Sequence, residues 1–271
     1  MIEIVGGGLI GLSCAWELQR RGLDVVVYER DVSRKSSSSW AGAGMLGALS
    51  ESFPDEVWRE RAAASAAMYR DWVEALGGSV DFHEGSLEAD GHVDPRDLLR
   101  ELSLRVRVEE RTVSSLDELD GQQLVVCTGA WGIKGLPPVE PVKGYLLAWD
   151  GVAAKTLRGI LRDGHTYILQ RENGRVIAGS TEQRIGFDAS IDEDVIEGLR
   201  KRAEELWPLL QTIPVTDRWF GFRPAAAGGL PVLHRMDDRV VLAYGHYRNG
   251  ILLAPWTARW VADEVQRQLG K

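Results

Sequence analysis

Residues 1–30 read MIEIVGGGLIGLSCAWELQRRGLDVVVYER, and this stretch decides the fold. Residues 2–5 (IEIV) are typical of a short buried strand, residues 9–21 space their apolar side chains as a helix does, and residues 23–28 contain consecutive valines. A continuous apolar strand is typical of a parallel sheet that is buried on both faces. We therefore expect a β-α-β unit and, built on it, an α/β protein with a Rossmann-like domain.

The glycines between the first strand and the first helix indicate a ligand. Gly6, Gly8 and Gly11 form the pattern G-x-G-x-x-G in the context that this pattern requires. Gly6 allows a tight turn, Gly8 lets a diphosphate approach the backbone, and Gly11 lets the helix pack closely on the strand. The diphosphate would lie on the N–H groups of Leu9 and Ile10 at the positive end of the helix. The alternative is a glycine-rich turn of another α/β protein.

The end of the second strand supports the same interpretation. Glu29 follows Gly11 by 18 residues, close to the separation expected for an acidic residue that binds the adenosine ribose. A carboxylate there can accept hydrogen bonds from both ribose hydroxyls, and it disfavours a 2′-phosphate. This fingerprint predicts a dinucleotide but does not choose between NAD and FAD.

The rest of the chain predicts a second, smaller domain. We expect an extended loop at 31–50, helices at 56–77, from 95 onward, at 192–206 and at 255–269, and strands at 104–108, 123–127, 215–223 and 239–243. Short alternating strands dominate 138–185, with a hairpin of 166–171 and 175–180 around Asn173-Gly174. These strands indicate an antiparallel sheet. We assign 1–77, 92–137 and 218–271 to the dinucleotide-binding domain, and 78–91 and 138–217 to the second, substrate domain.

Composition excludes some classes of partner. The net charge of −8 argues against nucleic acid and against an anionic membrane, so an anionic substrate would need a local cluster of arginines. Cys14 and Cys127 lie in apolar runs, which favours two buried thiols in a reducing compartment. No metal-ligand spacing surrounds them, so we expect no metal. The chain begins on a strand, and no run approaches the roughly 18 apolar residues of a membrane helix. We expect a cytoplasmic protein.

Five further segments carry a resemblance. They are WAGAGML at 40–46, GHTYI at 164–168, GST at 179–181, GFRP at 221–224 and GHYRNGILLAP at 245–255. In this order they resemble the D-amino-acid oxidase superfamily of FAD oxidoreductases, and the last segment is most similar to the glycine oxidases of thiamine biosynthesis. The resemblance implies FAD as the dinucleotide. Because no cysteine stands in the last segment, it implies FAD that is not covalently bound.

The resemblance also implies which residues hold the cofactor. Glu29 and Arg30 match the adenosine-ribose position, and Val113 matches a residue that contacts adenine. The loop that runs under the flavin corresponds to Ser38, Ser39, Ala43, Gly44 and Met45, and we add Thr128 and Gly129 after the strand at 123–127. The turn into the last helix, whose N–H groups would face the flavin, contains His246, Arg248, Asn249, Gly250, Ile251 and Leu252. A positive helix end there would stabilise negative charge on the reduced ring.

For the substrate, the resemblance implies Arg223 as the partner of its carboxylate, since a planar guanidinium binds a carboxylate with two hydrogen bonds. The alternative is a structural salt bridge. Tyr167 matches a tyrosine that helps hold the same carboxylate; otherwise it is a core tyrosine. His165 would share that face of the strand, or be structural. Further candidates are Arg248 as a second arginine, Met45 from the flavin loop, and Glu182 where relatives carry an apolar residue.

These residues suggest a reaction in which the cofactor supplies the chemistry, because no acid–base pair or nucleophile stands out. The resemblance implies oxidation of glycine or another small amino acid to an imine and then to a 2-oxo acid, ammonia and hydrogen peroxide, with dioxygen as the electron acceptor. A D-amino-acid or N-methylamino-acid oxidase or dehydrogenase is the first alternative. The chain is shorter than its family between Gly85 and Leu124, and a flavin-binding subunit with little turnover is therefore the second.

Overall fold

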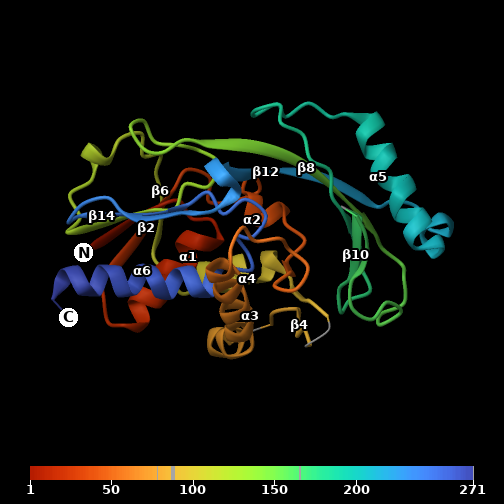
Figure 1. Ribbon diagram of the computed structural model, residues 1–271, viewed down its shortest axis with the longest axis horizontal. Helices are drawn as coiled ribbons and strands as arrows, with labels where there is room; N and C mark the ends of the chain where they lie inside the picture. The colour runs from red at the N-terminus through yellow and green to blue at the C-terminus, as the bar shows by residue number, and fades with distance from the viewer. Residues whose placement is uncertain (78, 87–88, 165, 271) are drawn as a thin grey trace.

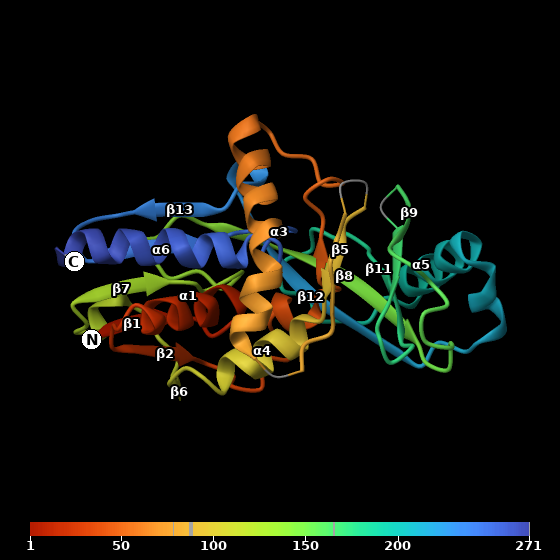
Figure 2. The ribbon, with the colours of Figure 1, turned by 90° about the horizontal axis from the view of Figure 1, so that it is seen from below.

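The computed structural model describes residues 1–77, 79–86, 89–164 and 166–270. Figure 1 shows two sheets placed at opposite ends of the molecule, joined by the long strands β8 (Val139–Trp149) and β12 (Asp217–Ala226). Helix α3 (Glu56–Leu76) crosses the middle, as the view from below in Figure 2 also shows. This arrangement confirms the expected α/β class, and it separates a parallel sheet from an antiparallel one.

The larger sheet contains the predicted β-α-β unit. Its order is β13-β14-β7-β1-β2-β6, in which β1 (Ile2–Val5) lies between β2 (Val25–Glu29) and β7 (Gln123–Val126) and is parallel to both. The outer strands are β6 (Val108–Glu110), β14 (Val240–Tyr244) and the antiparallel edge strand β13 (Val232–Arg235). The chain runs from β1 outward to β2 and β6 and then returns to the other side of β1 with β7. At such a reversal of strand order a crevice forms at the carboxyl ends of the strands, where α/β sheets bind ligands.

Helices cover one face of this sheet. Helix α1 (Leu9–Arg20) and helix α6 (Ala254–Leu269) pack side by side under it. Their apolar stripes are buried, including Leu12 and Leu18 on α1 and Val261 and Val265 on α6. Helix α3 packs on α6, and the short helix α4 (Pro95–Ser103), capped by Asp94, packs on α1. The apolar residues whose spacing predicted these helices are therefore the ones buried in the core.

The second sheet has the order β12-β8-β11-β10-β9 and is antiparallel throughout. It includes β9 (Leu161–Asp163) and the predicted hairpin, now bounded as β10 (Thr166–Gln170) and β11 (Val176–Gly179). Alternate residues face opposite sides: Ile168 and Leu147 pack with helix α5 (Glu193–Leu206), whereas Tyr167 and Leu146 face the flavin loop near Ala43. This alternation aims the polar groups of β10 and β12 at the site described below.

Some expected boundaries are wrong. Residues 31–50 are not wholly a loop, because they contain helix α2 (Ser38–Ala41), capped by Ser37, and strand β3 (Met45–Leu46). A strand was expected at 104–108, but α4 continues to Ser103 and the strand begins at Val108. Strand β8 is a single strand of 11 residues, longer than the short strands expected there. Strand β3 joins β4 (Phe82–His83) and β5 (Gly91–Val93) in a small third sheet.

The predicted domain division stays a proposal. Strand β12 hydrogen-bonds to β8 along its whole length, so the sheet pairing groups residues 217–226 with the antiparallel sheet, although we assigned 218–271 to the dinucleotide-binding domain.

In the part of the chain that the structure describes, none of the helices has the length and apolar character to cross a membrane.

Candidate active site

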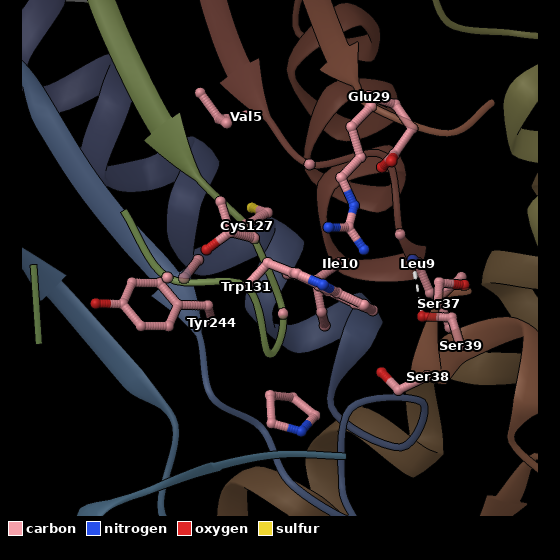
Figure 3. Close-up of a pocket in the computed structure, with 18 of the residues that line it drawn as sticks. Val5, Leu9, Ile10, Glu29, Ser37, Ser38, Ser39, Cys127, Trp131 and Tyr244 are labelled. Carbon is pink, nitrogen blue, oxygen red and sulfur yellow. Dashed lines mark hydrogen bonds between the residues drawn. The ribbon is translucent and has the colours of Figure 1, made fainter. Parts of the chain in front are cut away.

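A cavity of about 350 Å³ opens at the carboxyl ends of β1, β2 and β7 (Figure 3). We call it the first cavity. Thirteen of the predicted cofactor residues line it: Gly6, Gly8, Leu9, Ile10, Glu29, Arg30, Ser38, Ser39, Val113, Thr128, Gly129, His246 and Gly250. Gly11 instead packs against the Gly6 carbonyl, where a side chain would collide. The fingerprint residues therefore meet around one space.

The first cavity fits an anionic cofactor. Gly8, the N-cap residue of helix α1, has no side chain to cap the helix, and the first turn contains no acidic residue, so the positive end of the helix faces the cavity. The buried hydroxyl of Thr128 has no hydrogen-bond partner among the described residues. An unpaired buried hydroxyl is costly unless a ligand satisfies it. The Ser39 hydroxyl accepts from Leu9 N at 3.0 Å and so fixes the flavin loop to the helix start.

Glu29 is held in place by the backbone. Its Oε2 accepts from Gly7 N at 2.6 Å and its Oε1 accepts from Asp31 N at 3.0 Å. Arg34, which the sequence did not single out, lies beside it and donates from Nε to the Gly7 carbonyl at 2.7 Å. The carboxylate is thus fixed at the rim of the cavity, where the adenosine ribose of a bound dinucleotide would lie.

Two arginines bring positive charge to the same cavity. Burial lowers the pKa of Arg30 and of Arg34, and neither forms an ion pair within the described residues. The Arg30 guanidinium lies 3.8 Å from the ring centre of Trp131, which extends across the cavity toward Ser39 in Figure 3. Partly buried cations without a carboxylate partner favour an anion such as a diphosphate.

A second cavity of about 100 Å³ adjoins the first and shares Ser38, Ser39, Tyr247 and Gly250 with it. Most of the remaining predicted cofactor and substrate residues line this second cavity. Its lining includes Ala43, Gly44, Met45, Tyr167, Arg223, Arg248, Asn249 and Ile251. Leu252 is buried behind this wall. Because the two cavities share these four lining residues, one elongated cofactor could reach from the first into the second.

Arg223 is the uncompensated cation of the second cavity. It extends from β12 over Gly144 of β8, where a side chain would collide with its guanidinium. Its Nη2 donates to Ser180 Oγ at 2.7 Å and its Nη1 donates to the Thr181 carbonyl at 3.1 Å. Burial lowers its pKa although the charge of Glu182 opposes this, and no described carboxylate lies within ion-pair distance of it. The alternative of a structural salt bridge is therefore not observed.

Tyr167 stands next to this arginine. It is buried on β10, and burial raises the pKa of its hydroxyl although Arg223 and Arg248 oppose that rise. Ser180 also opposes that rise in the pKa of Tyr167, and its Oγ accepts from Arg223 Nη2. A tyrosine, a serine and an arginine thus converge on one point. The sequence did not single out Ser180, although it lies within the GST segment that carried the resemblance.

Arg248 has a partner that the sequence did not reveal. Its Nε lies 3.2 Å from Glu51 Oε2 and its Nη2 lies 3.4 Å from Glu51 Oε1. Burial works to lower the pKa of Arg248, and the Glu51 carboxylate more than offsets this, so the pKa is raised. The two arginines of the cavity therefore differ: one faces neutral oxygens and the other a carboxylate.

Of the other substrate candidates, Met45 lines the second cavity, where its Sδ lies 3.2 Å from Arg162 Nη2. The structure does not bring Glu182 into the lining of either cavity. Its side chain is 40% exposed and lies 3.5 Å from Arg184. Burial and the charge of Glu182 raise the pKa of Tyr247, which lines both cavities. His165 lies outside the described residues.

The turn into α6 is anchored from behind. Ser65 Oγ donates to the Leu252 carbonyl at 2.7 Å, and the Tyr69 hydroxyl donates to the Ile251 carbonyl, both from α3. His246 is buried with its Nε2 3.0 Å from Thr257 Oγ1, and burial lowers its pKa to about 3. The imidazole is therefore neutral and serves the turn as a fixed hydrogen-bonding group.

A second cluster lies outside the two cavities. Asp81, His83 and His92 gather at β4 and β5 in a grouping that could hold a metal ion. The buried guanidinium of Arg171 lies 3.3 Å from His92 Nδ1, and it donates to the Ala43 carbonyl at 2.6 Å. The positive charge beside these side chains is therefore that of Arg171. Through its hydrogen bond to Ala43, Arg171 links the flavin loop to the β10–β11 hairpin.

Comparison with known proteins agrees with this geometry. The family model DAO, described as FAD dependent oxidoreductase, matches residues 2–120 and 81–264. The curated bifunctional protein ThiO/ThiG of Nostoc sp. is 30% identical over 345 residues, which cover 98% of this chain and 53% of that protein. The chain therefore spans about half the length of these bifunctional relatives.

Glycine oxidases also match, over nearly their whole length. The glycine oxidase of Bacillus licheniformis is 26% identical, and the alignment covers 97% of this chain and 92% of that enzyme. The crystal structure of glycine oxidase from Geobacillus kaustophilus superposes with a TM-score of 0.86 at 26% identity, covering 98% of this chain and 94% of that one. Because the Nostoc alignment runs over 345 residues and the chain has 271, the relatives carry segments that are missing here.

Proposed function

Because this chain belongs to the DAO family of FAD-dependent oxidoreductases, we propose that it oxidises the C–N bond of a small amino acid. The observation that carries the proposal is Arg223, a half-buried arginine without a carboxylate partner among the described residues. A substrate carboxylate would satisfy it with two charge-assisted hydrogen bonds. Glycine is the first candidate, supported by the similarity to glycine oxidases.

The residues of the second cavity would bind and orient this substrate. Arg223 would hold the carboxylate through its planar fork, and Ser180 and Tyr167 would direct hydrogen bonds to the same oxygens. Met45 and Gly44 would limit the space left for a side chain. The small volume of about 100 Å³ supports a small amino acid.

The first cavity would hold FAD without a covalent link. Glu29 would accept from the ribose hydroxyls, and the start of α1 with Arg30 would bind the diphosphate. FAD bound there supplies the two-electron oxidation that turns the amine into an imine, which water hydrolyses to a 2-oxo acid and ammonia. The anchored turn at 249–252 would present backbone N–H groups to the ring, where they favour negative charge.

The setting of the reaction is also a proposal. We propose dioxygen as the electron acceptor, with hydrogen peroxide as product, and a role in thiamine biosynthesis, both supported by the similarity to ThiO/ThiG proteins and glycine oxidases. We propose a cytoplasmic location because Cys14 and Cys127 are buried and free, as in proteins of reducing compartments.

One experiment tests the function. The purified protein, loaded with FAD, is mixed anaerobically with glycine, sarcosine and a panel of D-amino acids, and the flavin absorbance near about 450 nm is followed. Bleaching with one of these amines is the expected result, and admitting air then separates an oxidase from a dehydrogenase. If none of these amines bleaches the flavin, the chain is not an amino-acid oxidase or dehydrogenase, and the flavin-binding subunit remains.

A further inference from the structure

We propose that Glu51 sets the charge of substrate that the second cavity accepts. By pairing with Arg248, it leaves Arg223 as the uncompensated cation among the described residues of that cavity, and the site then accepts substrates with a single carboxylate. This inference rests on the proposed function and names the specificity of the same site. It makes Glu51 a specificity-determining residue.

The pair lies inside the wall of the cavity. Glu51 comes from the turn after β3 and Arg248 from the turn after β14, and both residues line the second cavity. The side chain of Glu51 is 15% exposed and that of Arg248 is 23% exposed. Two separate nitrogen–oxygen contacts join them, at 3.2 and 3.4 Å. The carboxylate thus occupies two of the guanidinium's donor nitrogens at the wall of the cavity.

The turn that carries Glu51 is held in place. Glu51 N donates to the Gly47 carbonyl at 3.0 Å, and Leu49 N donates to Asp90 Oδ1 at 3.0 Å. A side chain on Gly47 would come within 3.0 Å of Glu51 Cγ, so the glycine leaves the space in which the Glu51 side chain lies. The carboxylate is therefore positioned by the fold and is not a mobile surface group.

The charges of the cavity define what fits. Two guanidinium groups and one carboxylate give a net charge of +1 for the ionisable arginine and glutamate side chains of the lining. One substrate carboxylate neutralises Arg223. A second carboxylate would have to face Glu51 or displace it from Arg248, and either change costs free energy because like charges repel at short distance. The selectivity thus comes from a repulsive group as much as from an attractive one.

The test replaces Glu51 by glutamine, which keeps the shape and removes the charge. Values of kcat/KM are measured for sarcosine, a secondary amine with one carboxylate, and for iminodiacetate, which carries two. We expect the ratio of iminodiacetate to sarcosine to rise by about tenfold or more in Glu51→Gln, because Arg248 becomes available. A ratio that does not change would overturn the proposal.

Two further variants assign the effect to this pair. In the double variant Glu51→Gln/Arg248→Met the gain should disappear, and a gain that persists would exclude Arg248 as its origin. Glu197→Gln removes a carboxylate that also pairs with an arginine, Arg200, but on the exposed face of α5. This control should leave the ratio as in the unchanged protein; a comparable rise would mean that net charge alone is responsible.

A binding experiment keeps this inference separate from the proposed function. Acetate and malonate are titrated into the FAD-loaded protein, and the change in flavin absorbance reports their binding without turnover. Glu51→Gln should tighten malonate by about tenfold relative to acetate. If no amine is oxidised but malonate tightens, the proposed function fails and the charge selection stands. If amines are oxidised and malonate does not tighten, the inference fails alone.

Discussion

Replacing Arg223 by methionine should abolish most of the affinity for the substrate carboxylate while leaving FAD in place. The substitution keeps an unbranched apolar stem of similar length and removes the guanidinium. Arg223 lines the second cavity and not the first, so the residues around the expected diphosphate and adenosine positions are untouched. Substrate binding and cofactor binding should therefore separate in this one variant.

The size of the effect follows from the hydrogen bonds of the guanidinium. A hydrogen bond to a charged group contributes about 1.5–3 kcal/mol, and a neutral one contributes about 1 kcal/mol. Nη1 and Nη2 already donate to Thr181 and Ser180, so the carboxylate exchanges two neutral acceptors for two charged ones. The net loss is about 1–4 kcal/mol, which corresponds to a fall in kcat/KM of roughly 5- to 700-fold.

The assay compares three proteins by anaerobic flavin reduction over a range of substrate concentrations. Arg223→Lys keeps the charge but loses the planar fork, so it should recover only part of the lost affinity. Arg218→Met is the matched control, since Arg218 lies on the same strand but is exposed and pairs with Glu193. An unchanged KM in Arg223→Met, with FAD bound, would refute the assignment of Arg223 to the carboxylate.

Three further results are expected. Gly144→Ala should raise KM, because the new methyl group would displace the Arg223 guanidinium; an unchanged KM would argue against the observed packing. Burial lowers the pKa of His246 to about 3, whereas a histidine in the unfolded chain takes up a proton below about pH 6.5. The unfolded state then binds more protons, so stability should fall as the pH drops from about 6.5 towards 3. Tm should decline less over that range in His246→Gln, and an equal decline would contradict this cause. Arg171→Met should weaken FAD binding several-fold and lower Tm, because the Ala43 carbonyl loses its buried hydrogen-bond donor. FAD titration measures the first effect and melting curves measure the second. If neither changes, the contact between Arg171 and Ala43 does not hold the flavin loop.

The part of the fold that could be predicted from the sequence is the part whose contacts are local. The turn at Gly6, Gly8 and Gly11 joins a strand to the helix that follows it, and its ligand-binding geometry depends on about ten consecutive residues. The spacing of apolar residues likewise placed α3 and α6 within a residue or so of their observed bounds. Local patterns missed α2, because a four-residue helix of serine, tryptophan and alanine shows no periodicity.

The candidate site was predictable only in part, because its remaining contacts join distant segments. Glu51 and Arg248 are 197 residues apart in the sequence, and neither carries a local mark of the other. Arg34 and Ser180 are likewise ordinary residues until the fold brings them beside Gly7 and Arg223. Glu182 shows the opposite case: its sequence position allowed either a substrate contact or a side chain pointing to solvent, and the fold leaves it 40% exposed and outside the lining of both cavities.

The paired strands β8 and β12 have a mechanical consequence. Their ten registered residue pairs run from the antiparallel sheet to the Ala225–His246 bridge beside the parallel sheet. Figure 1 shows them as a continuous span between the two ends of the molecule. Bending this span would break several backbone hydrogen bonds together, so it acts as a stiff beam and not as a hinge. Molecules should therefore enter and leave the second cavity through displacement of its short surface turns, with the distance between the two sheets kept constant.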